Sequence, residues 1–156
     1  MAEIQIKNVP AISVMSLSYT GPYEQTSDRL DDLMAWMLRV GHPYSDFPLG
    51  LFYDDPVKVA ADALRAEVCL PIQEECEGYE EVERKELPPV TVACMRFTGP
   101  YHDLSGVYQE VFAWMGENGY AYDEEAPCRE VYVKLLGQVD ESSQLVTEVQ
   151  VPVVSA

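Results

Sequence analysis

Two stretches of the chain, residues 12–19 and 90–97, contain apolar residues that alternate with polar ones and include several β-branched side chains. Such alternation predicts strands with one buried face. In the first stretch the alternation slips between Val14 and Met15, which we interpret as a β-bulge. Each stretch ends in the same four residues, Thr-Gly-Pro-Tyr, at 20–23 and 98–101. Glycine and proline there predict a turn that ends the strand.

Behind each turn the apolar spacing changes to that of a helix. The apolar stripes of the two predicted helices consist of Leu30, Leu33, Met34 and Met37, and of Leu104, Val107, Tyr108, Val111, Phe112 and Met115. Gly41 and Gly119 follow at positions that suit a left-handed helix cap. Two further strands are expected after each helix, at about 49–55 and 62–71, and at about 128–136 and 144–153.

These similarities come from an internal duplication with a shift of 78 residues. Between residues 9–44 and 87–122, 12 of 36 positions are identical without a gap, whereas chance predicts about two or three. The predicted fold is therefore α+β, a duplicated β-α-β-β repeat with pseudo-two-fold symmetry. Its two helices are expected to lie on a shared, mainly antiparallel sheet. We expect a single domain over 1–156, with repeat one at 4–71, a connector at 72–86 and repeat two at 87–153.

Charge and cysteine content limit the possible partners. The chain has 27 acidic and 10 basic residues, a net charge of −17, so direct binding to nucleic acid or to an anionic membrane is disfavoured. The N-terminus lacks the pattern of a secretory signal, and we expect a cytoplasmic protein with reduced thiols. The four cysteines are scattered and only two histidines occur, so no metal or cofactor is expected.

Strand alternation suggests where the carboxylates point. With the apolar faces of the strands under the helices, Glu67, Glu130 and Glu148 are expected on the second face, together with Tyr132. They are either ordinary surface charges or part of a binding site. Trp36 and Trp114 occupy equivalent helix positions, and they either pack at the helix–sheet edge or line a groove where the two halves meet. A carboxylate framed by aromatic rings favours a delocalised organic cation.

The repeat, the twin Thr-Gly-Pro-Tyr motifs, the Ala-Trp-Met helices, residues 129–132 (Arg-Glu-Val-Tyr) and residues 147–152 (Thr-Glu-Val-Gln-Val-Pro) together resemble the GyrI-like family. This family includes the effector-binding domains of AraC-type and MerR-type multidrug-responsive regulators. The resemblance implies a ligand groove at the junction of the halves. It also implies contacts to cationic aromatic drugs from Glu130, Tyr132 and Glu148, with Gln150 where some relatives carry an aromatic residue. The remaining candidate ligand-binding residues are Glu67, Trp114, Trp36, Tyr53 and Cys69.

Three functions follow as hypotheses from the residues and the resemblance. The first is a stand-alone module that binds or sequesters bulky hydrophobic cations, since no DNA-binding segment is present and a regulator would be a separate partner. The second is hydrolysis of strained alkylating drugs, with Glu67 or Glu148 as general base. In this hypothesis Cys69 is a possible nucleophile, but it lacks a paired histidine. His102 is expected to begin the helix and not to act as a catalyst. The third is a protein-interaction role on DNA gyrase, for which the family is named. An enzyme is the less favoured reading, and no catalytic residue is assigned.

Overall fold

The computed structural model describes residues 3–74, 76–78, 80–135 and 138–156. The chain forms two compact units. Unit 1 contains the residues up to Val9 together with Val90–Ala156, and unit 2 contains Pro10–Pro89. The polypeptide therefore passes between the units twice, at Val9–Pro10 and at Pro89–Val90.

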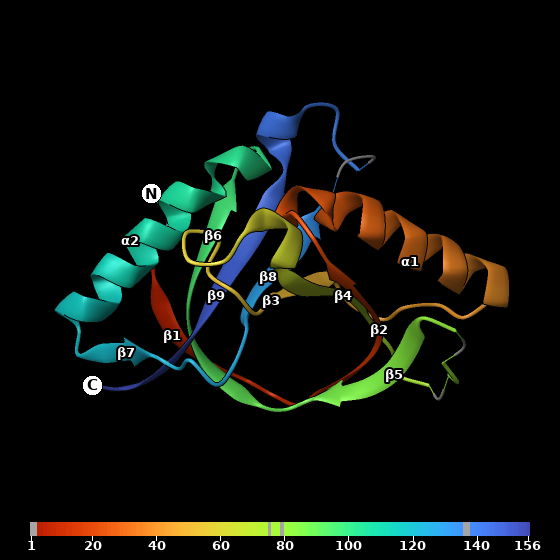
Figure 1. Ribbon diagram of the computed structural model, residues 1–156, viewed down its shortest axis with the longest axis horizontal. Helices are drawn as coiled ribbons and strands as arrows, with labels where there is room; N and C mark the ends of the chain where they lie inside the picture. The colour runs from red at the N-terminus through yellow and green to blue at the C-terminus, as the bar shows by residue number, and fades with distance from the viewer. Residues whose placement is uncertain (1–2, 75, 79, 136–137) are drawn as a thin grey trace. The chain divides into compact units, whose positions relative to one another are not determined.

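Each unit carries one α-helix and a set of antiparallel strands (Figure 1). The helices are α1 (Thr26–Val40) and α2 (Leu104–Glu117), each preceded by a short 3-10 turn, η1 (Tyr23–Gln25) and η3 (Tyr101–Asp103). The strands are β1 (Gln5–Val9), β2 (Ile12–Thr20), β3 (Leu49–Phe52), β4 (Arg65–Pro71), β5 (Val82–Leu87), β6 (Val90–Thr98), β7 (Tyr120–Tyr122), β8 (Cys128–Lys134) and β9 (Val146–Ser155). Neither helix is long and apolar enough to cross a membrane. The α+β class predicted from the sequence is confirmed.

In unit 2 the strand order is β3-β4-β2-β5, and every neighbouring pair is antiparallel. Helix α1 packs on β2 and β4 through Leu30, Leu33 and Met37, three of the four residues of the predicted stripe, and Met34 is only partly buried. The helix ends at Gly41, whose φ of 70° is the left-handed conformation that glycine adopts without strain. Its amide bonds the Leu38 carbonyl and so closes the last turn.

In unit 1 the strand order is β1-β6-β9-β8, and β7 pairs with β9 beyond the start of β8. Helix α2 packs on β6, β7 and β9 (Figure 1). The buried core between helix and strands contains Ala93, Met95, Leu104, Val107, Val111, Met115, Val149, Val151 and Val153. This core identifies the helix-facing side of each strand: odd-numbered residues of β6 and β9 point toward α2.

The two repeats close their turns in the same way. The amide of Gly21 donates to the Leu64 carbonyl, and the amide of Gly99 donates to the Leu145 carbonyl, each at 2.8 Å. These glycines have φ values of 146° and 153°, which other residues rarely adopt. The Thr-Gly-Pro-Tyr motif thus ties the end of each repeat's long strand to the start of its last strand.

Three strands were not predicted from the sequence: β1, β5 and the short β7. Residues 82–86 lie within the stretch expected to be a connector, yet they belong to β5. Strand β1 precedes β2 in the chain but pairs with β6, and β5 precedes β6 but pairs with β2. Each repeat therefore contributes its first strand to the unit formed by the other repeat.

The predicted β-bulge between Val14 and Met15 is wrong. The register of β2 runs without a shift through both residues, against β4 and against β5. Val14, Met15, Ser16 and Leu17 are all buried, so both faces of β2 are covered here. A strand covered on both faces need not alternate between apolar and polar residues, and the slip reflects this burial.

Candidate functional site

Glu130 lies on β8 with its carboxylate held by two tyrosines. Tyr108 of α2 donates its hydroxyl to Oε2 at 2.6 Å, and Tyr132 of β8 donates to Oε1 at 3.1 Å. The ring of Tyr132 meets that of Tyr101 edge to face, with centroids 5.9 Å apart. Among the described residues, no Lys, Arg or His forms an ion pair with Glu130. The site is one partly buried carboxylate among phenol rings.

The surroundings of Glu130 change the acidity of the groups around it. Burial raises the pKa of Glu130 above its usual value, although the hydrogen bonds from Tyr108 and Tyr132 act in the opposite direction. Burial and the neighbouring carboxylate raise the pKa of Tyr108 well above the ordinary value, so its hydroxyl remains a donor. Burial also raises the pKa of Cys128 to about 12, which keeps this sulfur a neutral thiol and a poor nucleophile.

The expectation that Glu130 and Tyr132 share a face with Glu148 is wrong. Glu130 lies directly opposite Val149 of β9, a core residue under α2, whereas Glu148 lies opposite Val131. Glu130 and Tyr132 therefore face the helix, and Glu148 faces the other side of the sheet. The error came from placing the apolar residues of β8 under the helix. A glutamate can lie there because Tyr108 reaches it with a hydroxyl.

Glu148 is 5% exposed and is neutralised by basic residues. Its carboxylate accepts hydrogen bonds from Lys7 of β1 at 3.1 Å, from Arg96 of β6 at 3.2 Å and from Gln150 at 2.6 Å. Burial acts to raise the pKa of Glu148, but these three hydrogen bonds outweigh it and hold the pKa below its usual value. Glu148 is thus a paired carboxylate that stays ionised.

Glu67 of β4 is 8% exposed and has a similar environment. Oε1 accepts a hydrogen bond from Ser18 at 3.1 Å and from Lys85 of β5 at 2.5 Å, and Oε2 accepts one from Tyr53 at 3.1 Å. The predicted equivalence of Glu67 and Glu148 holds in the structure. Glu67 lies opposite Ser18, and Glu148 lies opposite Arg96. Arg96 is 78 residues after Ser18, so the two glutamates face equivalent positions of the repeat.

Lys7 and Lys85 are site residues that the sequence reasoning missed. They are 78 residues apart, they lie on the two outer strands β1 and β5, and each forms the ion pair with its unit's buried glutamate. The signal was present in the sequence, because the 78-residue shift extends upstream to this lysine pair. It was overlooked because no strand was expected on either side of it.

The other predicted residues are dispersed. Gln150 lies beside Glu148, and Tyr53 lies beside Glu67 with the Arg65 guanidinium 5.9 Å above its ring. Cys69 is fully buried.

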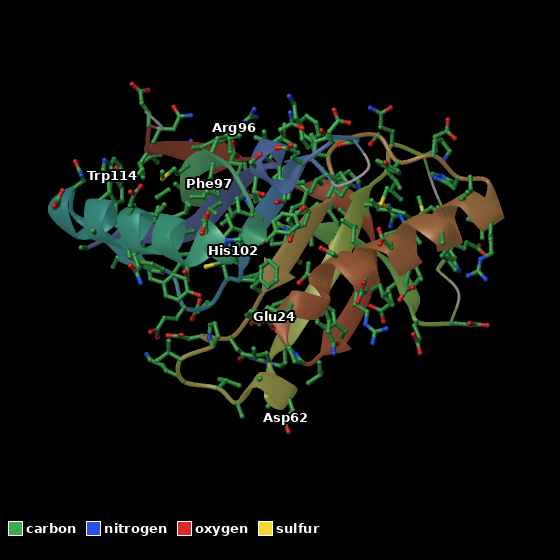
Figure 2. All side chains as sticks on the ribbon, turned by 90° about the horizontal axis from the view of Figure 1, so that it is seen from above. Glu24, Asp62, Arg96, Phe97, His102 and Trp114 are labelled. Atoms are coloured by element: carbon green, nitrogen blue, oxygen red, sulfur yellow. The ribbon has the colours of Figure 1, made fainter. Side chains whose placement is uncertain are left out.

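The two tryptophans that were candidates for lining a groove, Trp36 and Trp114, have different surroundings. Trp114 stacks on Tyr120 at 5.9 Å and 8°, and it lies at the end of α2 away from His102, as Figure 2 shows. Trp114 thus packs at the helix–sheet edge, the first of the two alternatives stated for the tryptophans. Trp36 of α1 is partly buried. His102 lies in η3 immediately before α2 and is exposed.

The described residues of unit 2 contain no counterpart of the Glu130 site. Matching Glu67 with Glu148 places Gly50 of β3 where β8 has Glu130, and Phe52 where β8 has Tyr132. The 78-residue shift places Leu30 where α2 has Tyr108. The edge contact between Tyr101 and Tyr132 is retained as Tyr23 against Phe52, with centroids 4.9 Å apart. Unit 1 has therefore a polar, acidic version of an arrangement that is apolar in unit 2.

A separate hollow of about 520 Å³ lies at the far end of β8 from Cys128. Its lining is mostly polar and includes Thr98, Lys134, Asp140 and Gln144. Glu130 is not among its lining residues, so this hollow does not belong to the tyrosine–glutamate site.

Known proteins share both this sequence pattern and this architecture. A DNA gyrase inhibitor from Pectobacterium carotovorum subsp. carotovorum is 28% identical over 121 residues, which cover 75% of this chain and 78% of that protein. The crystal structure of the EcmrR C-terminal domain superposes with a TM-score of 0.86 at 19% identity, covering 100% of this chain and 99% of that one. In the EcmrR–DNA complex the matched region is 58% of the EcmrR chain.

A third structure, SAV2435 bound to tetraphenylphosphonium, has a TM-score of 0.61 at 13% identity, with 97% of this chain and 94% of that chain covered. These likenesses establish the fold. The sequence profile of the GyrI-like small molecule binding domain matches residues 2–154, almost the whole chain. The duplicated units, the twin turns and this match together show that the chain belongs to the GyrI-like family of small-molecule-binding domains.

Proposed function

We propose that this protein binds bulky hydrophobic cations and that Glu130 supplies the charge that recognises them. The proposal rests on a difference between three glutamates in the partners of their carboxylates. Glu67 and Glu148 are paired with lysine, whereas Glu130 is held by the hydroxyls of Tyr108 and Tyr132 and has no ion pair among the described residues.

A carboxylate withdrawn from water without a countercharge is energetically unfavourable. An incoming cation supplies that countercharge, and the faces of the surrounding tyrosines add a favourable electrostatic contribution. A small, strongly hydrated ion would lose its water on binding here, whereas a large organic cation has little hydration to lose. Glu130 is only partly buried, so part of its surface remains accessible to such a ligand.

One structural relative supports this class of ligand, and a second shows the fold as part of a longer chain. SAV2435 was solved with tetraphenylphosphonium, a cation surrounded by four aryl groups. The EcmrR C-terminal domain belongs to a protein solved in complex with DNA, in which this fold is one part of a longer chain. We propose that the present protein senses or sequesters its ligand in the cytoplasm.

A protein-interaction role is the second candidate, because relatives that match this chain are DNA gyrase inhibitors and the net charge is −17. Such a role depends on the acidic surface and not on the buried carboxylate. Binding of gyrase by the Glu130→Gln variant with unchanged affinity, together with no response to organic cations, would favour this candidate.

The test compares two ions of nearly the same shape and opposite charge, tetraphenylphosphonium and tetraphenylborate, in a thermal unfolding experiment. A ligand that binds only the folded protein stabilises it by about 2.7 kcal/mol at a concentration 100 times its Kd. We expect tetraphenylphosphonium to raise the Tm and tetraphenylborate to leave it unchanged. Equal shifts with both ions would show that the site recognises aryl groups and not charge.

A further inference from the structure

Aromatic side chains continue beyond Glu130 along α2 and the β7–β8 edge of unit 1. As the helix advances from η3 to its C-terminal end, the facing residues run backwards along the chain from β8 to β7. The successive contacts are Tyr101 with Tyr132, Tyr108 with Glu130, Phe112 with Tyr122, and Trp114 with Tyr120. We call this row the aromatic seam. Glu130 is its one acidic member.

The seam residues that follow Glu130 are Phe112 and Tyr122, and Cys128 lies near Tyr122. Cys128 lies two residues before Glu130 on the same strand, so both face α2, and its thiol packs against the core of unit 1. The Tyr122 hydroxyl lies close enough to the Cys128 thiol to influence its pKa. Phe112 lies one helical turn after Tyr108, and its ring meets Tyr122 at 5.7 Å and 78°.

Phe112 contacts Tyr122 at one edge and yet remains 41% exposed. An edge-to-face pair with a free ring surface can take a third ring in the same manner. Strand spacing puts Cys128 about 7 Å from Glu130 along β8, so a single molecule can reach both. The ring of Phe112 is specific to unit 1, because the 78-residue shift puts Met34 at this position of α1.

We propose that Phe112, Tyr122 and Cys128 form an aryl subsite, which takes a ring of a ligand whose cationic centre lies at Glu130. This inference rests on the function proposed above and narrows it: the ligands are cations that carry at least one aromatic ring close to the charged atom. Cations of similar size with only alkyl groups occupy the charge site without using the subsite. Cys128 takes part as a neutral, polarisable wall and forms no bond to the ligand.

The test is titration calorimetry with tetraphenylphosphonium and tetrabutylphosphonium, which share the charge and differ in their rings. We expect Phe112→Ala to weaken tetraphenylphosphonium binding about tenfold and tetrabutylphosphonium binding less than about twofold. Phe112→Leu keeps an apolar side chain without a ring, and it is expected to weaken tetraphenylphosphonium binding by an intermediate factor. Phe47→Ala, which truncates a phenylalanine in unit 2 that is 43% exposed, is the matched control and should change neither affinity.

The outcomes separate the subsite from the charge site. If Phe112→Ala and Phe47→Ala give the same affinity for tetraphenylphosphonium, or if Phe112→Ala weakens both cations equally, the aryl subsite is wrong. If the wild type does not bind tetraphenylphosphonium, or Glu130→Gln binds it as tightly as the wild type, the proposed function itself fails. Far-UV circular dichroism of each variant confirms that the fold is retained.

Discussion

Glu130 and Glu148 lie on neighbouring strands of one sheet and point to opposite sides of it. Glu130 is opposite Val149 and faces α2, while Glu148 is opposite Val131 and faces away. One carboxylate has two phenol partners and a raised pKa, and the other has two cations and a lowered pKa. In the proposed function, this contrast separates a charge available to the ligand from a charge used for structure.

Replacing Glu148 by glutamine is expected to destabilise the protein by about 1–2 kcal/mol at pH 7, since two hydrogen-bonded cations lose their partner. The expected loss of stability is modest because the Lys7 and Arg96 side chains are 43% and 58% exposed and remain hydrated. The pKa of Glu148 is lowered by folding, so its stabilising contribution is present above the unfolded value and is lost as the pH falls through the folded value. Urea unfolding at pH 7 and at acidic pH measures this difference. If the free energies of unfolding of the wild type and Glu148→Gln differ by the same amount at all pH values, the ion-pair explanation is contradicted.

Glu130→Gln is expected to have the opposite effect on stability. Folding raises the pKa of Glu130, so the ionised carboxylate costs stability at pH values above the folded pKa. The variant should be as stable as the wild type or more stable at pH 7, and its advantage should shrink as the pH falls through the folded pKa. Urea unfolding at pH 7 and at acidic pH measures this change in stability. If Glu130→Gln lost as much stability as Glu148→Gln, Glu130 would be a structural residue.

The two equivalent lysines are expected to differ in importance. Lys85→Met leaves Glu67 with Ser18 and Tyr53 as partners, whereas Lys7→Met leaves Glu148 with Arg96 and Gln150. Because only the second carboxylate keeps a cation, we expect Lys85→Met to cost about 1–2 kcal/mol and Lys7→Met less than about 1 kcal/mol. Chemical denaturation of both variants at neutral pH gives the comparison. A larger loss for Lys7→Met would mean that Arg96 does not compensate.

Ligand affinity is expected to depend on the ionisation of Glu130. Protonation removes the charge that the cation recognises, so the Kd of tetraphenylphosphonium should rise about tenfold for each pH unit below the pKa of the free site. Since the pKa of Glu130 is raised, this loss should begin at a higher pH than it would for an ordinary glutamate. Calorimetry across the acidic range, with unfolding monitored in parallel, measures it. Affinity that is constant until the protein unfolds would count against a charge-dependent site.

Much of the fold followed from the 78-residue repeat, because the turn motifs, the helical stripes and the closing strands are local patterns that occur twice. Strands β1 and β5 were missed because each pairs with a strand of the other repeat, an exchange that no local pattern reveals. The face of Glu130 was assigned wrongly because alternation gives two faces but does not say which one the helix covers. The Tyr108 hydroxyl, brought from α2, and the Tyr132 hydroxyl together explain a carboxylate on that side.

The most direct measurement is the affinity for tetraphenylphosphonium of the wild type, Glu130→Gln and Glu110→Gln at neutral pH. Glu110 is an exposed residue of the same helix that carries Tyr108, so its replacement removes one negative charge without altering the tyrosine–glutamate site. The account predicts that Glu130→Gln binds the cation at least about tenfold more weakly than the wild type, and that Glu110→Gln binds it within about twofold. Equal affinities for all three proteins would contradict the central claim that the carboxylate of Glu130 selects the ligand.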